Sequence, residues 1–179
     1  MSFVTDVYSR RILAWKVATD KHAELVVAAL IQAVSLRRRG NNNFSPAGVI
    51  HHSDAGSQYT SRDVALLLEE FDMTGSIGAV GDAYDNGVME SAIGLYKTEL
   101  IDRDKDRRWC SWREVERETA DWISWYSNRR LHSSICDVPP VEYEEDFAAL
   151  NSDIVECAAG VSNGLCVSRP ALTQGDQAQ

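Results

Sequence analysis

The chain has 179 residues, of which 44% are hydrophobic and 25% are charged, a composition typical of a globular domain. The net charge is −9 and unevenly spread, because residues 1–50 hold seven basic and three acidic side chains, which leaves 11 basic and 24 acidic side chains for the remainder. A surface that reads a nucleic-acid duplex is expected to be basic. This balance therefore excludes the chain as a dedicated reader of duplex sequence.

The cysteines and the hydropathy pattern exclude further classes. No pair of cysteines has the C-x-x-C spacing of a zinc site, so we interpret all four as reduced thiols that pack as small apolar residues. The N-terminus has no apolar run long enough for a signal peptide. The most apolar stretch, residues 25–31, is far too short to span a bilayer. We therefore expect a soluble, cytoplasmic chain with no membrane partner.

The N-terminal third predicts a hairpin followed by a helix. Residues 3–7 and 12–18 are rich in β-branched and aromatic side chains and flank a polar turn, which indicates two antiparallel strands. Thr19 or Asp20 can cap a helix whose apolar residues recur at helical spacing. The helix is expected to end at residues 37–40, where three arginines form a solvated terminus and glycine is the stop.

The middle of the chain predicts two short strands around a helix. Residues 48–53 are expected to form a short buried strand that leads into Asp54. Ser61 is positioned to cap a helix over residues 62–71, and a strand follows near residues 74–77. Residues 78–86 contain glycines and no apolar periodicity, which favours a mobile loop.

The C-terminal half predicts helices and then a tail. Asp85 or Asn86 can cap a helix that carries Glu90. Spacings of four, three and four along this helix predict core packing for Met89, Ile93, Tyr96 and Leu100. Further helices are expected over residues 111–126 and 140–150. Four tryptophans in or just before the first of these are interpreted as core residues, with stacking on bases as the alternative. We predict one domain over residues 1–149 and a disordered tail over residues 150–179, which lack apolar periodicity.

Asp54 and Glu90 are candidates for a metal site. Thirty-five residues lie between them, and Lys97 follows Glu90 by seven residues. Seven residues at ~100° each return to nearly the same helix face, ~10 Å further along the axis. An acid and a cation on one face suit divalent ions and the phosphate backbone on which they act. Each residue also has a simpler role: a strand-end turn for Asp54, a favourable helix N-terminus for Glu90 and a solvated surface for Lys97.

The sequence around these residues is more specific than their spacing, and it resembles the integrase-like core of bacterial insertion-sequence transposases, which are DDE polynucleotidyl transferases. The resemblance extends from about Val4 to about Phe147. The matching runs are residues 51–61 (HHSDAGSQYTS), 81–86 (GDAYDN), 90–91 (ES), 97–101 (KTELI), 125–134 (WYSNRRLHSS) and 139–143 (PPVEY).

The resemblance also shows what is missing. In that family the first of three acids lies on the first strand of the sheet, upstream of a segment like residues 3–12. Asp6 matches the turn between the next two strands, so we expect it to bond local backbone amides instead of a metal. The resemblance therefore implies an α/β fold, a ribonuclease-H-like mixed sheet with flanking helices, whose first, central strand is absent. Loss of a central strand leaves two exposed edges, so a marginally stable or aggregating chain is expected.

The resemblance gives Asp54 and Glu90 catalytic roles as metal ligands. Each would hold one of two Mg²⁺ or Mn²⁺ ions, which the absent aspartate bridges. In the family, water attack frees a 3′ hydroxyl, and this hydroxyl then attacks target DNA in a transesterification. Since catalytic groups of this kind act as a unit, we expect the chain to be inactive alone.

The resemblance also implies DNA as the partner, both as transposon ends and as target. Lys97 is expected to hold a terminal phosphate or base, and Arg129, Arg130 and His132 are the best local candidates for contact with backbone phosphates. Because the chain is acidic, recognition of specific ends is assigned to a separate helix-turn-helix module. A second copy or a full-length transposase is the expected protein partner.

Two other interpretations stay open at this stage. The chain could be a non-catalytic regulatory or dimerising fragment that binds full-length transposase or DNA ends. It could also be a gene remnant without a function.

Overall fold

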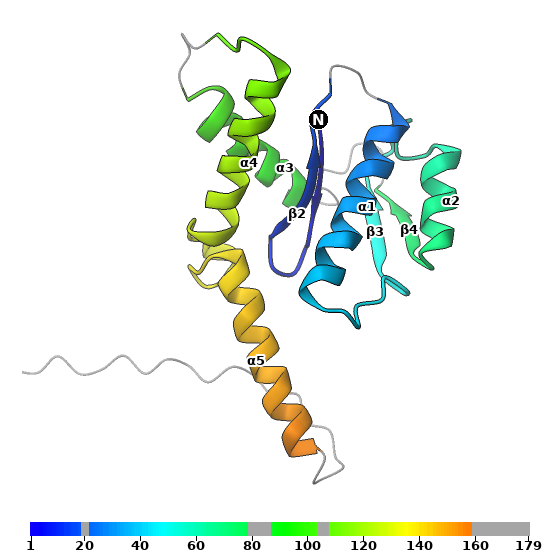
Figure 1. Cartoon of the computed structure of the whole chain (residues 1–179), viewed down its shortest axis with the longest axis vertical. Helices are drawn as coiled ribbons and strands as arrows, with labels where there is room; N and C mark the ends of the chain where they lie inside the picture. Colours follow the sequence, from blue (N-terminus) through cyan, green and yellow to red (C-terminus); the bar gives the residue numbers. More distant parts are fainter. Residues whose placement is uncertain (19–21, 79–86, 104–107, 159–179) are drawn as a thin grey trace, which may run out of the picture. The chain divides into compact units, whose positions relative to one another are not determined.

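The computed structural model describes residues 1–18, 22–78, 87–103 and 108–158, and it divides the chain into two compact units, Met1–Glu144 and Glu145–Gln179. Two strands come first, helices and short strands alternate from α1 to α3, and only helices follow α3 in the described residues (Figure 1). The elements are β1 (Ser2–Thr5), β2 (Ile12–Lys16), α1 (Ala23–Gly40), β3 (Ile50–Ser53), α2 (Arg62–Glu70), β4 (Thr74–Ile77), α3 (Gly87–Tyr96), the π-helix η1 (Lys97–Ile101), α4 (Trp112–Asn128), the 3₁₀ helix η2 (Ser133–Ile135) and α5 (Pro140–Ala158). No helix in the described part of the chain is long and apolar enough to cross a bilayer.

The predicted N-terminal hairpin is confirmed, and α1 packs against it. β1 and β2 are antiparallel, with Phe3 opposite Trp15, and a bulge shifts the register after Val4. The buried face of α1 includes Ala29 and Ala33, which pack with Ala14 of β2 into a cluster of small side chains. Small residues here let the helix backbone approach the hairpin closely. The predicted capping residues, Thr19 and Asp20, lie outside the described residues, and the observed N-cap is His22.

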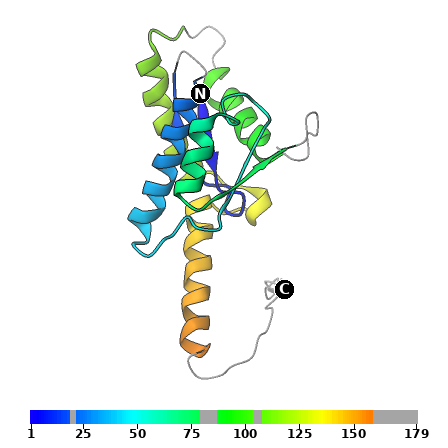
Figure 2. The same ribbon diagram turned by 90° about the vertical axis from the view of Figure 1, so that its right-hand side faces the viewer.

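A second sheet is formed by β3 and β4, which run parallel. Ser61 caps α2 as predicted, because its hydroxyl accepts a hydrogen bond from the Val64 N–H at 3.4 Å. Val64 and Leu67 of α2 pack with Val26 and Leu30 of α1, and the two helices lie side by side (Figures 1 and 2).

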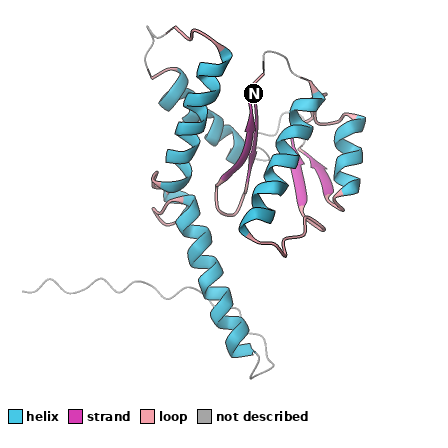
Figure 3. Cartoon of the chain, in the orientation of Figure 1, coloured by secondary structure: helices cyan, strands magenta, loops and turns pink. Residues whose placement is uncertain are grey.

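The prediction that the strand before Asp54 is buried was wrong. Ile50 in β3 is 67% exposed, and the strand has no buried residue. The reason is the arrangement of the sheets: β1 pairs only with β2, and β3 only with β4 (Figure 3). Among the described residues no strand joins the two pairs. The described strands thus form two separate two-stranded sheets.

An aromatic cluster connects the hairpin to α3 and α4. Phe3 and Trp122 each meet Tyr96 edge-on, with ring centroids 5.3 Å apart, and Trp122 also contacts Tyr126. The Tyr96 hydroxyl lies 2.9 Å from the Thr119 hydroxyl, so the polar tip of the buried ring is satisfied. The core role predicted for the α3 residues is therefore confirmed.

Only part of the interpretation of the tryptophans and cysteines holds. Trp122 is buried, as predicted, but Trp112 and Trp125 are 49% and 41% exposed. Both side chains face solvent. Helical spacing alone does not reveal which face of α4 other elements cover. Cys110 and Cys136 are both exposed, so they do not pack as small apolar core residues.

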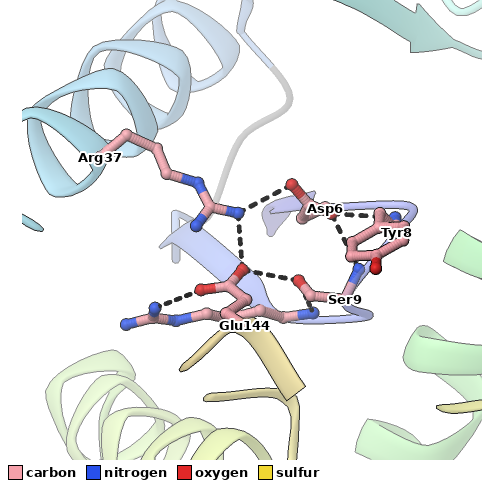
Figure 4. A network of polar contacts seen from close by, with 6 residues as sticks. Asp6, Tyr8, Ser9, Arg37 and Glu144 are labelled. Atoms are coloured by element: carbon pink, nitrogen blue, oxygen red, sulfur yellow. Dashed lines mark hydrogen bonds and ion pairs between the residues drawn. The ribbon is translucent and has the colours of Figure 1, made fainter. Parts of the chain in front are cut away.

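A network around Glu144 ties three segments of the first unit together (Figure 4). The Glu144 carboxylate accepts hydrogen bonds at 2.7 Å from Ser9, Arg11 and Arg37. Arg37 also pairs with Asp6 at 2.7 Å, so it is not the solvated helix end that the sequence predicted. Asp6 itself accepts two backbone N–H groups of the hairpin turn at 2.9 Å, which confirms its predicted local role.

The charges in this network stabilise one another. Burial by itself would raise the pKa of Glu144, but hydrogen bonds from Arg37, Ser9 and Arg11 outweigh it and lower that pKa. Burial alone would likewise lower the pKa of Arg37, yet its two carboxylate partners raise it overall. The network therefore favours the ionised forms of both groups.

The last helix is longer than predicted. α5 runs from Pro140 to Ala158, whereas the sequence placed its end at residue 150 and a disordered tail beyond it. Asn151, Ser152 and Asp153 favour caps and turns, but the alanines and leucine before them are strong helix formers, and the helix continues. Residues 159–179 of the predicted tail lie outside the described residues. The division between the two compact units falls after Glu144.

Glu144→Gln is expected to loosen the hairpin turn. The substitution removes a charged acceptor from three donors, which corresponds to about 1–3 kcal/mol of local stability. Because the folded pKa of Glu144 is lowered, its contribution is present above the usual value of 4.5 and is lost as the pH falls through the lowered value. In the variant, we expect the amides of residues 8–11 to exchange faster than in the parent chain. Their exchange rate should also change less as the pH falls. Glu142→Gln, at an exposed position of the same helix, is the control.

The isolated chain is expected to unfold over a broad temperature range or to aggregate. A two-stranded sheet is marginal in water, and unpaired edges promote association. Circular dichroism during heating, combined with size-exclusion chromatography, measures both properties. A sharp, cooperative transition of a soluble monomer would contradict this expectation.

Candidate active site

Asp54 directly follows β3 and is exposed in a tight turn. Its Oδ1 accepts the Gly56 backbone N–H at 2.9 Å. A Cβ atom at position 56 would lie 2.8 Å from this oxygen and 2.7 Å from Gln58 Nε2, closer than such contacts allow. Gly56 therefore lets the turn close on the Asp54 carboxylate and leaves Oδ2 without a contact from this turn.

The groups around Asp54 are neutral side chains that are partly buried. Burial, and then the nearby Asp54 carboxylate, raise the pKa of Tyr59, so its phenol stays protonated. Burial, and then the neighbouring His52, lower the pKa of His51, so its imidazole is neutral at pH 7. His52 Nδ1 lies 3.0 Å from the Ser76 hydroxyl across the β3–β4 pair. His52 therefore links the side chains of the two paired strands.

Glu90 and Lys97 lie on the α3–η1 segment. Glu90 is exposed in the first turn of α3, and Lys97 is exposed at the first residue of η1. Thr98 bonds back to the carbonyls of Gly94 and Leu95 at 3.0 and 3.2 Å, where the helix widens from α to π geometry. π-helical turns of this kind occur frequently at functional sites. The structure therefore presents both side chains to solvent on one continuous helical segment.

The three residues expected to contact phosphates occupy different environments. Arg129, the C-cap of α4, is exposed. Arg130 donates from Nε to Glu99 at 3.1 Å, and Glu99 also accepts from the Trp122 indole at 3.0 Å. The geometry therefore favours Arg129 for contact with DNA and engages Arg130 in the core.

His132 is buried, and its ring is occupied. Its Nε2 lies 3.1 Å from the Tyr126 carbonyl, and the ring meets the Tyr126 ring edge-on at 4.4 Å. Burial lowers the pKa of His132; the nearby Arg130 adds to this effect, and the Tyr126 carbonyl opposes it. A neutral, buried imidazole is a poor phosphate ligand, so this geometry favours a structural role. Sequence reasoning missed this because a histidine in a basic run reads as a surface residue.

The donor chemistry of Asp54 and Glu90 fits a hard divalent ion. Carboxylate oxygens are the ligands that Mg²⁺ prefers. Within residues 1–18, 22–78, 87–103 and 108–158, however, no three His, Cys, Asp or Glu side chains gather closely enough to hold a metal ion. Asp54 and Glu90 therefore belong to no group of three potential ligands within these ranges.

Comparison with solved structures defines the class of the fold. The catalytic core domain of BIV integrase matches with a TM-score of 0.59 at 19% identity, over 83% of this chain and 88% of that one. The HTLV-2 integrase catalytic core domain, solved in complex with magnesium, matches with a TM-score of 0.55 at 10% identity, over 78% of this chain and 80% of that one. The fold is therefore that of retroviral integrase cores, and the predicted ribonuclease-H-like class is confirmed.

Comparison of sequences then gives the family. The family described as Integrase core domain matches twice, over residues 1–83 and residues 72–140, and these segments include Asp54 and Glu90. A putative transposase for insertion sequence element IS986/IS6110 from Mycobacterium tuberculosis is 45% identical over 149 residues, which is 83% of this chain and 52% of the relative. The transposase for insertion sequence element IS629 from Shigella sonnei is 39% identical over 83% of this chain and 47% of its own length. The chain belongs to the integrase core family of insertion-sequence transposases, and it spans about half the length of these relatives.

The His132 ring is expected to titrate below the usual 6.5, because burial disfavours the imidazolium. A histidine with a lowered folded pKa contributes its full stability above 6.5 and loses it as the pH falls towards the lowered value. An NMR titration of the ring protons measures this pKa, and His132→Gln should remove the corresponding pH dependence of amide exchange near η2. A ring that titrates at 6.5 or above would contradict the assignment.

Proposed function

We propose that this chain is the part of a transposase integrase core that supplies Asp54 and Glu90 to metal-dependent cleavage and strand transfer of DNA. The observation that supports the proposal best is the placement of the two acids in an integrase fold: one directly follows a strand, and the other is an exposed residue in the first turn of a helix. Both lie within segments that match the Integrase core domain family.

Asp54 and Glu90 would hold the divalent ions on which the integrase core family depends. Bound ions of this kind neutralise charge on the attacking and leaving oxygens of a phosphodiester. The turn that Gly56 closes fixes the Asp54 carboxylate, and the neutral Tyr59 and His51 add no competing cation beside it. Lys97 and Arg129 are exposed cations that would contact the DNA backbone.

The chain is proposed to be inactive alone. Two carboxylates without a third ligand do not fix the spacing of a metal pair, and groups that act as a unit lose most of their effect together. Transposon-end and target DNA would be the substrates. The separate helix-turn-helix module, and a second copy or a full-length transposase, would be the partners that provide end recognition and assembly.

A chimera tests the roles of the two acids. The matched segment of the Mycobacterium relative is replaced by residues 1–149 of this chain, and Mg²⁺- or Mn²⁺-dependent nicking of a plasmid that carries that element's ends is measured. We expect nicking by the chimera and a loss of at least about 10³-fold in Asp54→Asn and Glu90→Gln. Asp121→Asn, an exposed acid on α4, is the matched control and should keep activity.

Either of two results would contradict the proposal. Nicking by a chimera with Asp54→Asn would show that Asp54 is not a required metal ligand. Mg²⁺-dependent nicking by the chain alone, abolished by Asp54→Asn, would show that it is active without a further acid.

The open sheet edges favour one alternative, a regulatory chain that binds another protein. β1 and β3 each present an edge without a partner strand among the described residues. Such edges are templates for pairing with another polypeptide. The test is co-purification of the chain with an intact transposase, together with a nicking assay of that transposase. Binding of the chain without a change in nicking would distinguish a binding role from a catalytic one.

A further inference from the structure

Glu99 joins the helical segment that carries Lys97 to α4 and to the residues that follow it. One oxygen of the Glu99 carboxylate accepts the Trp122 indole N–H at 3.0 Å, and the other accepts the Nε–H of Arg130 at 3.1 Å. The side chains of Glu99 and Arg130 are only 27% and 22% exposed. Hydrogen bonds to an ionised group are stronger than neutral ones, and here both carboxylate oxygens are bonded. Glu99 therefore holds its own helical turn against α4.

The turn that Glu99 holds is the one in which the helix widens. The Asp102 N–H bonds to the Lys97 carbonyl, five residues back, at 2.7 Å, which is the spacing of a π-helix. Glu99 lies in the middle of this five-residue element, η1. Because π-helical turns are rare, contacts from outside the helix are expected to maintain this one. The bonds from Trp122 and Arg130 are contacts of that kind.

Trp122 contacts the segment at two points on one side. The edge of its ring meets the buried ring of Tyr96, with centroids 5.3 Å apart, and its indole N–H bonds to Glu99. Tyr96 and Glu99 are three residues apart, so both lie on one face of the helical segment. The aromatic contact sets how closely the segment approaches α4, and the hydrogen bonds set its rotation.

Glu99 and Lys97 point to different sides of this segment. Two residues at ~100° each place their side chains roughly 200° apart around the axis. Glu99 is partly buried, and Lys97 is exposed. Glu90, seven residues before Lys97, is exposed as well and lies on nearly the same face as Lys97. The bonds of Glu99 to Trp122 and Arg130 therefore turn the face that carries Glu90 and Lys97 away from α4.

We propose that Glu99 is a positioning residue for Lys97. By bonding to Trp122 and Arg130, it fixes the rotation of the π-helical turn and so holds the Lys97 ammonium group towards the phosphate backbone of DNA. Glu99 itself touches neither the DNA nor a metal ion, because both of its oxygens face α4 and Arg130. The inference rests on the proposed function, from which it takes the contact between Lys97 and DNA.

The sign of the effect on DNA binding separates positioning from simple electrostatics. Glu99→Gln removes a negative charge and releases the Arg130 guanidinium, and both changes by themselves favour binding to DNA. Only a loss of the Lys97 contact would weaken binding. Glu99→Asp keeps the charge but is one methylene shorter, so it breaks the two bonds without a change in net charge.

Fluorescence anisotropy of a labelled DNA duplex, titrated with the full chain at several salt concentrations, tests the inference. We expect both Glu99 variants to weaken binding roughly tenfold at about 50 mM salt, and to lower the salt slope by about 1, as Lys97→Gln does. Lys97→Gln combined with Glu99→Asp should lose no more than Lys97→Gln alone, because the two residues act on one contact. Asp102→Asn, an exposed acid at the end of η1, is the control and should not weaken binding.

The results distinguish a failure of this inference from a failure of the proposed function. Tighter or unchanged binding by the Glu99 variants, while Lys97→Gln weakens binding, would overturn the positioning role and leave the DNA contact of Lys97 intact. Unchanged binding by Lys97→Gln would overturn that DNA contact, and the inference with it.

Hydrogen–deuterium exchange of the full chain tests the positioning step without DNA. The amides of residues 98–102 should exchange roughly tenfold faster in both Glu99 variants than in the parent chain. Exchange in α1 should stay unchanged, which shows that the rest of the fold is intact. Unchanged exchange over residues 98–102 would overturn the inference. Glu99→Asp, which keeps a charged group near Arg130, provides the answer if Glu99→Gln does not fold.

Discussion

The Glu144 carboxylate is the interaction on which the first unit depends. It gathers Ser9 and Arg11 from the hairpin and Arg37 from the end of α1 around the start of α5. Three donors on one half-buried carboxylate compensate for its desolvation, which a single partner would not do. The network therefore fixes where the hairpin turn meets α1.

The same unit combines a well-packed half with an open one. Around Tyr96 and Trp122 the aromatic rings meet edge-on, and their polar tips are bonded, so this half is specified by its own contacts. Between β1 and β3 the backbone has no shared neighbour among the described strands. Helix α1 holds the two sheets near each other, because it packs on the hairpin and on α2. The fold is thus retained by helices where strand pairing is missing.

The likeness to known proteins and the candidate site rest on different observations. Relatives at 45% and 39% identity match this chain over 83% of its length, whereas Asp54 and Glu90 lie in a local turn and at a helix start. A metal site in an integrase core, however, needs carboxylates from separate elements at fixed spacing. Asp54 and Glu90 are the candidates for two of these acids, and they lie on separate elements, after β3 and in α3.

The sequence by itself determined the local structure of this protein. The hairpin, the Ser61 cap, β4 and the α3 core positions all follow from short-range patterns: alternation, capping chemistry and helical spacing. The two candidate acids, and the family to which they point, also came from short motifs. These signals depend only on residues a few positions apart, so the sequence alone reveals them.

Only the tertiary structure decided which polar residues act as structural supports. Arg37, Arg130 and His132 read as surface cations, but each is engaged by a partner that lies far away in the sequence or on another element: Glu144, Glu99 and the Tyr126 carbonyl. The exposure of β3 was likewise decided by the absence of a neighbouring strand in the described fold. Burial and pairing are properties of segments that meet in space, and no local pattern encodes which segments meet.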